Sequence, residues 1–245
     1  MTRVCGGRVI VSSTRSWRGG LAALILMVIP SGTLPAQSPG ATIMGKILYR
    51  GAVPSPTTVS VSRDADVCGA TVSVQPLVVD PQTHGVQDVV VSLAADGPFP
   101  APVQGQTTIY NNKCRFLPRI SVGQVGAPME IGNRDPIMHN THITNESGTL
   151  INVALVAGGT PVKKVFKRGG IHTVKCDRHK FMQGYVLAFN HPFYALTDAT
   201  GHFRLSAVPA GTRTITVWHE VLGTVKKEVQ VPSSGEIQVT LEVGA

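Results

Sequence analysis

The sequence predicts an all-β protein of the sandwich type. Gly and Pro are frequent, with 26 and 17 of 245 residues, and they separate short apolar segments, which favours many strands over long helices. No segment carries the 3.6-residue apolar period of an amphipathic helix, and no apolar run reaches the roughly 18 residues of a membrane-spanning helix. Because 42% of the residues are hydrophobic, the chain can fill one large core or two small ones.

The first 36 residues have the order of a secretory signal. The apolar stretch 21–30 follows four basic residues, Arg3, Arg8, Arg15 and Arg18, and small and polar residues continue to Ala36. Leu34 fits the small-residue rule for cleavage poorly, so a retained N-terminal anchor is the alternative. Segment 1–36 holds four basic and no acidic residues, so its removal lowers the net charge from +8 to +4. We expect an exported protein, with membrane attachment only if this segment is retained.

Strands are expected in sequence along the remaining chain. Short β-branched or alternating apolar segments occupy residues 43–48, 59–61, 86–93, 107–110, 128–131, 150–156 and 171–176. Gly123 and Gly126 predict a turn over 122–126. Near the C-terminus, apolar residues alternate with polar ones, which predicts a half-buried antiparallel edge strand containing Ile237, Val239, Leu241 and Val243.

The chain changes character near His191 and Pro192. The motif Thr197-Asp198-x-x-Gly201-x-Phe203, followed by Pro209-x-Gly211, resembles the carboxypeptidase-regulatory, transthyretin-like sandwich. Such domains open with a Gly-x-Ile strand, which segment 45–51 resembles. This resemblance implies a split domain of residues 41–100 plus 193–245, with residues 101–192 inserted. Two sandwiches in series are the alternative.

Three cysteines follow the export segment, which is an odd number for an oxidising compartment. Cys68 and Cys114 have no His, Met or carboxylate cluster close by in sequence, so a disulfide between them is the economical interpretation. Two separately buried thiols are the alternative. Cys176 is left for a different role.

Cys176 begins a motif whose residue types suit copper. The loop has the spacing Cys176-x-x-His179-x-x-Met182, and His139 lies on an upstream loop. One thiolate, two imidazoles and a weak thioether form the ligand set of a trigonal copper site. Zinc accepts Cys and His but has little use for Met. The alternatives are purely structural side chains, or a nucleophilic cysteine, for which the loop offers neither an orienting third group nor an oxyanion site.

Residues 101–192 resemble the cupredoxins, within them the plastocyanin- or amicyanin-like, methylamine-utilisation-type periplasmic group. The resemblance rests on Asn133-x-Asp135-x-x-x-His139-Asn140, on the Cys176 loop, and on Gly184-Tyr185-Val186 after Met182. It implies a cupredoxin Greek-key sandwich beside the second, transthyretin-like one. It also implies that copper is bound equatorially by His139, Cys176 and His179 and axially by Met182, and that Asn140 ties the two loops together.

The function implied is one-electron transfer in the periplasm rather than catalysis. We expect the His179 edge to lie near the surface, with Phe181 in a docking patch for a cytochrome or another redox protein. Alternatives are a structural or assembly subunit of a membrane complex, and copper delivery or storage. The remaining basic residues form scattered pairs without interleaved aromatics, which argues against nucleic-acid binding.

Four further histidines have no role that the sequence assigns. His142 is close enough to His139 to flank the site or replace a ligand. His172 shares a strand face with Cys176, where a satisfied structural histidine is expected. His191 and His219 are expected to pack between domains, with Trp218 as the anchor.

Overall fold

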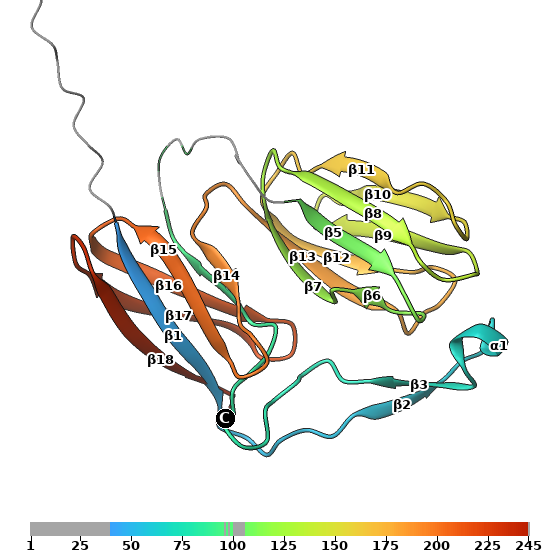
Figure 1. Cartoon of the computed structure of the whole chain (residues 1–245), viewed down its shortest axis with the longest axis horizontal. Helices are drawn as coiled ribbons and strands as arrows, with labels where there is room; N and C mark the ends of the chain where they lie inside the picture. Colours follow the sequence, from blue (N-terminus) through green and yellow to red (C-terminus); the bar gives the residue numbers. More distant parts are fainter. Residues whose placement is uncertain (1–39, 96, 98, 100–105, 245) are drawn as a thin grey trace, which may run out of the picture. The chain divides into compact units, whose positions relative to one another are not determined.

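The computed structural model describes residues 40–95, 97, 99 and 106–244, so segment 1–36, the expected export signal, lies outside the described residues. The all-β prediction is confirmed, because strands dominate the described part and its one helix has four residues. Figure 1 labels the strands, which form two β-sandwiches and one hairpin arm.

The first sandwich is built from two sheets. Sheet order β15-β1-β18 contains His202–Val208, Ala41–Tyr49 and Glu236–Val243, and sheet order β14-β4-β16-β17 contains Tyr194–Leu196, Val90–Leu93, Gly211–His219 and Gly223–Val231. Alternate residues of both sheets face a common core that includes Ile43, Val91, Phe203, Ile215 and Leu241. Strands β1, β16 and β18 bury every second residue over most of their length, as the alternation predicts, whereas all four residues of β4 are buried.

The second sandwich is continuous in sequence. One sheet has the order β10-β9-β12-β13-β7, with bounds Gly148–Leu155, His139–Asn145, Gly170–Lys175, Gln183–Phe189 and Ile120–Gln124. The other has the order β11-β8-β5-β6, with bounds Val162–Val165, Pro128–Asn133, Thr107–Asn111 and Phe116–Leu117. Its core includes Ile109, Ile131, Ile143 and Val186, and Cys176 and Met182 belong to the same cluster.

Residues 57–74 form an arm that belongs to neither sandwich. The arm contains β2 (Thr57–Ser60), α1 (Ala65–Cys68) and β3 (Thr71–Val74), and β2 pairs with β3 in an antiparallel hairpin. The disulfide predicted between Cys68 and Cys114 is present and fastens the arm to the second sandwich. A hydrogen bond of 2.8 Å from Arg115 Nη2 to the Ser73 carbonyl adds a second attachment.

The turn motif of the first sandwich has the form that its residues predict. Asp198 Oδ1 accepts the backbone N–H groups of Thr200 and His202 at 2.8 and 2.9 Å, and Gly201 adopts a φ of 83°. Phe203, two residues after Gly201, is 5% exposed and lies in the core. The assignment of this sandwich as transthyretin-like stays a prediction.

Three local predictions are wrong. The C-terminal strand β18 is an edge strand, but it pairs with β1 in parallel rather than antiparallel. The turn predicted over 122–126 is present only at 125–126, because residues 122–124 continue strand β7, and glycine fits position 123 because a Cβ there would clash with the Thr107 side chain. The segment 86–93 becomes a strand only from Val90, since Asp88 has a left-handed φ of 60°.

Candidate metal centre

The three predicted ligands meet at one edge of the second sandwich. His139 is the first residue of β9, and Cys176 directly follows the last residue of β12. Because β9 and β12 pair antiparallel, the start of one lies beside the end of the other. His179 and Met182 lie in the loop from β12 to β13, so the strand pairing delivers residues separated by nearly forty positions to the same place.

The donor atoms of His139, Cys176 and His179 converge in the protein interior. Nδ1 of His139 lies 3.1 Å from Nδ1 of His179, and Cys176 Sγ lies 4.0 and 3.6 Å from these two atoms. The three residues are 0%, 1% and 2% exposed. Cys176 is a free thiol. One imidazole pair and one sulfur thus face a common point that water does not reach.

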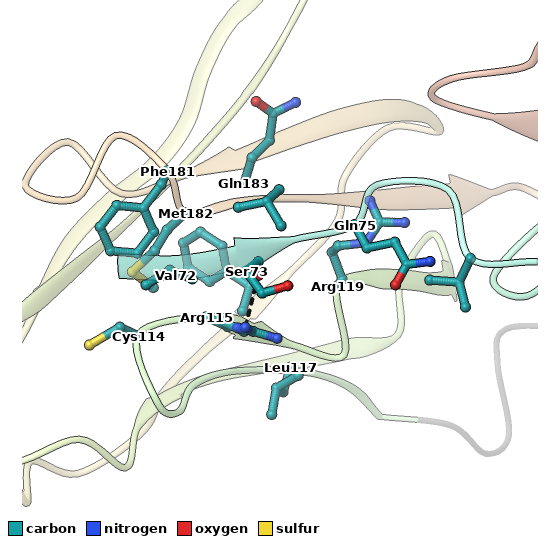
Figure 2. A pocket seen from close by; sticks show the side chains of 13 residues that line it. Val72, Ser73, Gln75, Cys114, Arg115, Leu117, Arg119, Phe181, Met182 and Gln183 are labelled. Carbon is teal, nitrogen blue, oxygen red and sulfur yellow. Dashed lines mark hydrogen bonds between the residues drawn. The ribbon is translucent and has the colours of Figure 1, made fainter. Parts of the chain in front are cut away.

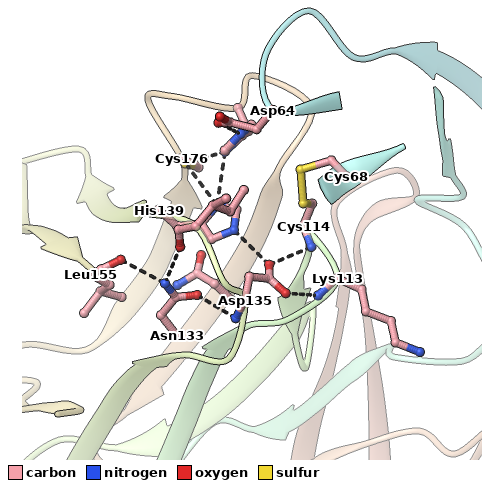
Figure 3. A network of polar contacts seen from close by, with 12 residues as sticks. Asp64, Cys68, Lys113, Cys114, Asn133, Asp135, His139, Leu155 and Cys176 are labelled. Carbon is pink, nitrogen blue, oxygen red and sulfur yellow. Dashed lines mark hydrogen bonds and ion pairs between the residues drawn. A yellow bond between two sulfur atoms is a disulfide. The ribbon is translucent and has the colours of Figure 1, made fainter. Parts of the chain in front are cut away.

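Each imidazole is held from behind by a carboxylate. His139 Nε2 lies 2.8 Å from Asp135 Oδ2, and His179 Nε2 lies 2.9 Å from Asp64 Oδ2. Figure 3 shows both carboxylates around His139 and Cys176. An ionised carboxylate only accepts hydrogen bonds, so each Nε2 carries the proton and donates it. Each neutral ring then has its lone pair on Nδ1, which is the atom that faces the centre.

Electrostatics favour the neutral form of His139 and the ionised form of Asp64. Burial lowers the pKa of His139 despite the opposing hydrogen bond with Asp135. The pKa of Asp64 is lowered to about 2, chiefly by its hydrogen bond with Arg178 and also by that with His179. The imidazole of His139 is therefore neutral and Asp64 is ionised at neutral pH.

This donor set fits a copper ion. Two Nδ1 lone pairs facing each other at 3.1 Å repel unless a proton or a cation lies between them, and the thiol proton of Cys176 can satisfy only one of them. A thiolate with two imidazoles suits copper. A second group of donors, Cys114, Asp135 and His139, is excluded because the Cys114 sulfur is in the disulfide.

Asn140 and Met182 support the two loops. Asn140 Oδ1 accepts the Asp177 N–H at 2.7 Å and the Cys176 thiol at 3.4 Å, so it ties the β9 edge to the cysteine loop. Met182 is 2% exposed, and its N–H donates to the His179 carbonyl at 2.9 Å. Its carbonyl accepts the Cys176 N–H at 3.4 Å, which closes the loop around the site.

The His179 edge is expected near the surface, but the structure leaves this residue almost fully buried. The arm covers it, because Asp64 contacts Nε2 and leaves the residue only 2% exposed. Phe181 is half-buried, and its ring centre lies 5.7 Å from that of His179. Its part in a docking patch stays a prediction. Phe181 and Met182 line a pocket of about 260 Å³ together with Val72 and Ser73 of β3. Figure 2 shows these side chains.

The other histidines lie apart from the three donor atoms. His142 contacts Asp177 Oδ1 and Thr149 Oγ1 at 3.2 and 3.0 Å. His172 is buried against Phe166, with 5.0 Å between ring centres. His191 packs on Phe99, Phe189 and Phe193, and His219 is buried next to Glu220. His142 therefore does not replace a ligand here.

Two carboxylates and one arginine of the site, Asp135, Asp64 and Arg178, are not predicted from the sequence. Asp135 was noted only as part of a motif, although its position four residues before His139 was an available signal. It is also the orienting third group that the nucleophilic alternative lacked in the sequence. Asp64 and Arg178 had no such signal, because 114 positions separate them.

Comparisons with known proteins found no matching family model and no matching curated sequence. Among solved structures, a mutant of amicyanin in its reduced Cu(I) form at pH 4 is similar, with 20% identity over 40% of this chain and 97% of that chain, and a TM-score of 0.32. The purple cupredoxin from Nitrosopumilus maritimus has 21% identity over 34% of this chain and 98% of that chain, and a TM-score of 0.30. The copper-containing nitrite reductase from Thermus scotoductus SA-01 has 18% identity over 40% of this chain and 25% of that chain, and a TM-score of 0.32.

Across residues 40–95, 97, 99 and 106–244, no helix is long and apolar enough to cross a membrane.

Proposed function

We propose that this protein is a periplasmic copper protein with a mononuclear type 1 site that transfers single electrons. The observation that carries the proposal is the convergence of two Nδ1 atoms and one free thiol in a buried site. Copper bound there would supply a one-electron couple between Cu(I) and Cu(II). His139, Cys176 and His179 would hold it, and the thioether of Met182 would be a further, weak donor.

The role of the chain is to fix the donors and exclude water. Two carboxylates orient the imidazoles, Asn140 couples the two loops, and the β-sandwich core surrounds Cys176 and Met182. Ligands held in this way move little between oxidation states, which suits rapid electron exchange. The partner would be a cytochrome or another redox protein.

Copper storage or a structural role in a membrane complex is the second candidate. The burial of His179 beneath the arm favours it, because the imidazole edge expected to pass electrons is covered. Catalysis by Cys176 is less well supported, since the thiol is 1% exposed and is in contact with a second imidazole, that of His179.

The test is copper(II) addition to residues 37–245, followed by visible absorption and electron paramagnetic resonance. We expect an intense thiolate-to-copper band that Cys176→Ser abolishes. Reduction by a small soluble cytochrome then separates the two candidates: a carrier reacts quickly, whereas a storage or structural protein keeps its colour. A folded protein without the band would contradict the copper site itself.

A further inference from the structure

Asp64 occupies an unusual position for an aspartate at the start of a helix. It is the N-cap residue of α1, yet its side chain makes no capping hydrogen bond. An N-cap aspartate normally accepts the backbone N–H of the first helical turn, which stabilises the helix. Asp64 also has a left-handed φ of 58°, which is costly for a residue other than glycine. The chain therefore gives up local stability to direct this carboxylate elsewhere.

The carboxylate of Asp64 reaches two residues of the cysteine loop. Oδ1 and Oδ2 accept from Nη2 and Nε of Arg178, both at 2.7 Å, in a two-pronged ion pair. Oδ2 also accepts from His179 Nε2 at 2.9 Å. Arg178 thus fixes the orientation of the carboxylate, and the carboxylate fixes the ring of His179.

The arm that carries Asp64 is fastened to the second sandwich by two further contacts. Cys68, at the end of α1, is bonded to Cys114 of the second sandwich, and Arg115 binds the Ser73 carbonyl of β3. Both attachments come after Asp64 in the chain, and they hold the helix that follows it against the second sandwich. The side chain of Asp64 is only 18% exposed.

We infer that Asp64 is a positioning residue for the metal centre: its carboxylate selects the Nε2–H form of His179 and strengthens that imidazole as a ligand for Cu(II). The part of this inference that concerns copper rests on the proposed function. A negative acceptor behind Nε2–H increases the electron density on Nδ1, which stabilises the higher oxidation state. Arg178 neutralises part of this charge and limits the effect.

A purely mechanical role is the competing explanation. The contact between Asp64 and Arg178 would then only fasten the arm, and the hydrogen bond to His179 would be incidental. The two roles make different predictions, because fastening depends on Arg178 whereas the effect on His179 depends on the carboxylate.

The first experiment uses the metal-free protein and nitrogen-15 NMR of the histidine rings. We expect the wild-type protein to show His179 in the Nε2–H form. Asp64→Ala should lose this preference, and Asp64→Asn should retain it because the amide oxygen still accepts. Asp66→Asn, an exposed aspartate on the same helix, is the matched control and should behave as wild type.

The second experiment measures the relative affinities for Cu(II) and Cu(I). Asp64→Asn keeps the shape and removes the charge, so Cu(II) affinity should fall by about tenfold to a hundredfold, while Cu(I) affinity changes less. Arg178→Gln should loosen the arm, detected by faster hydrogen exchange over 57–74, and should lose less Cu(II) preference than Asp64→Asn, because the carboxylate remains.

The inference is overturned if Asp64→Ala leaves the His179 form unchanged, or if Arg178→Gln reproduces the full copper effect of Asp64→Asn. If wild-type protein binds no copper, the proposed function fails, and the NMR comparison alone then decides whether Asp64 positions His179.

Discussion

The backbone N–H of Cys114 donates to Asp135 Oδ2 at 2.8 Å, and this same oxygen accepts from His139 Nε2 at 2.8 Å. The sulfur of Cys114 is bonded to Cys68, which ends the helix that Asp64 begins. The carboxylates behind the two imidazoles are therefore both supported by residues next to or within one disulfide. This disulfide is part of the framework of the metal centre.

Removal of the disulfide should destabilise the protein and open the arm. The bridge joins residues 46 positions apart, so the loop-entropy model gives a loss of about 4 kcal/mol for Cys68→Ser with Cys114→Ser. Urea denaturation of the metal-free protein measures this loss, and hydrogen exchange over 57–74 measures the opening. A loss below about 1 kcal/mol with unchanged exchange would show that the other contacts suffice.

Asp135→Asn should weaken copper binding and also destabilise the fold. The carboxylate accepts three donors, the N–H groups of Lys113 and Cys114 and His139 Nε2, and an amide offers only one oxygen. An unsatisfied buried donor costs about 1–3 kcal/mol, and loss of a carboxylate behind a ligating histidine lowers metal affinity by about tenfold to a hundredfold. Competition with a coloured copper chelator gives the affinity, and Asp66→Asn is the control. Wild-type affinity would contradict the role of Asp135.

Met182→Leu should keep the thiolate-to-copper band and raise the reduction potential. The substitution conserves volume at a site that is 2% exposed, so the fold should tolerate it. Loss of a weak thioether donor favours Cu(I), and a tenfold change in relative affinity corresponds to about 59 mV. Voltammetry of the two proteins checks this. An unchanged potential would mean that the Met182 sulfur does not touch the metal.

Stability should fall as the pH drops from about 6.5 to about 4, in part because of His219. Burial, assisted by the positive charge of Arg119, lowers the pKa of His219 from 6.5 to about 4. Between these values the unfolded state binds the proton and the folded state does not, so protonation favours unfolding, and below about 4 the contribution stays constant. Over this pH range, protonation of His219 lowers the free energy of unfolding by about 3 kcal/mol.

His219→Asn should therefore flatten the curve of unfolding free energy against pH over this range, while His202→Asn, at an exposed histidine, should leave its slope unchanged. Urea titrations at several pH values provide the comparison. Equal slopes for wild type and His219→Asn would exclude His219 as a source of the pH dependence.

The grouping of Cys176 with His179 was predictable because its signal is local. The Cys176-x-x-His179-x-x-Met182 spacing lies within one loop. The all-β fold class was predictable from the short apolar segments between Gly and Pro residues. The parallel pairing of β18 was not predictable, since alternation fixes which residues are buried but not the direction of the neighbouring strand. The contact between Asp64 and His179 spans 115 positions and depends on the placement of the arm, for which the sequence contains no pattern.

The strand order of the first sandwich has a consequence for synthesis. Strands β1 and β4 are made before the second sandwich, but their partners β14, β15, β16 and β18 are made after it. A growing chain therefore carries the apolar faces of β1 and β4 uncovered, while residues 107–189 already contain all the strands of the second sandwich. The first sandwich is thus the last to be completed, and until then β1 and β4 have none of their sheet partners.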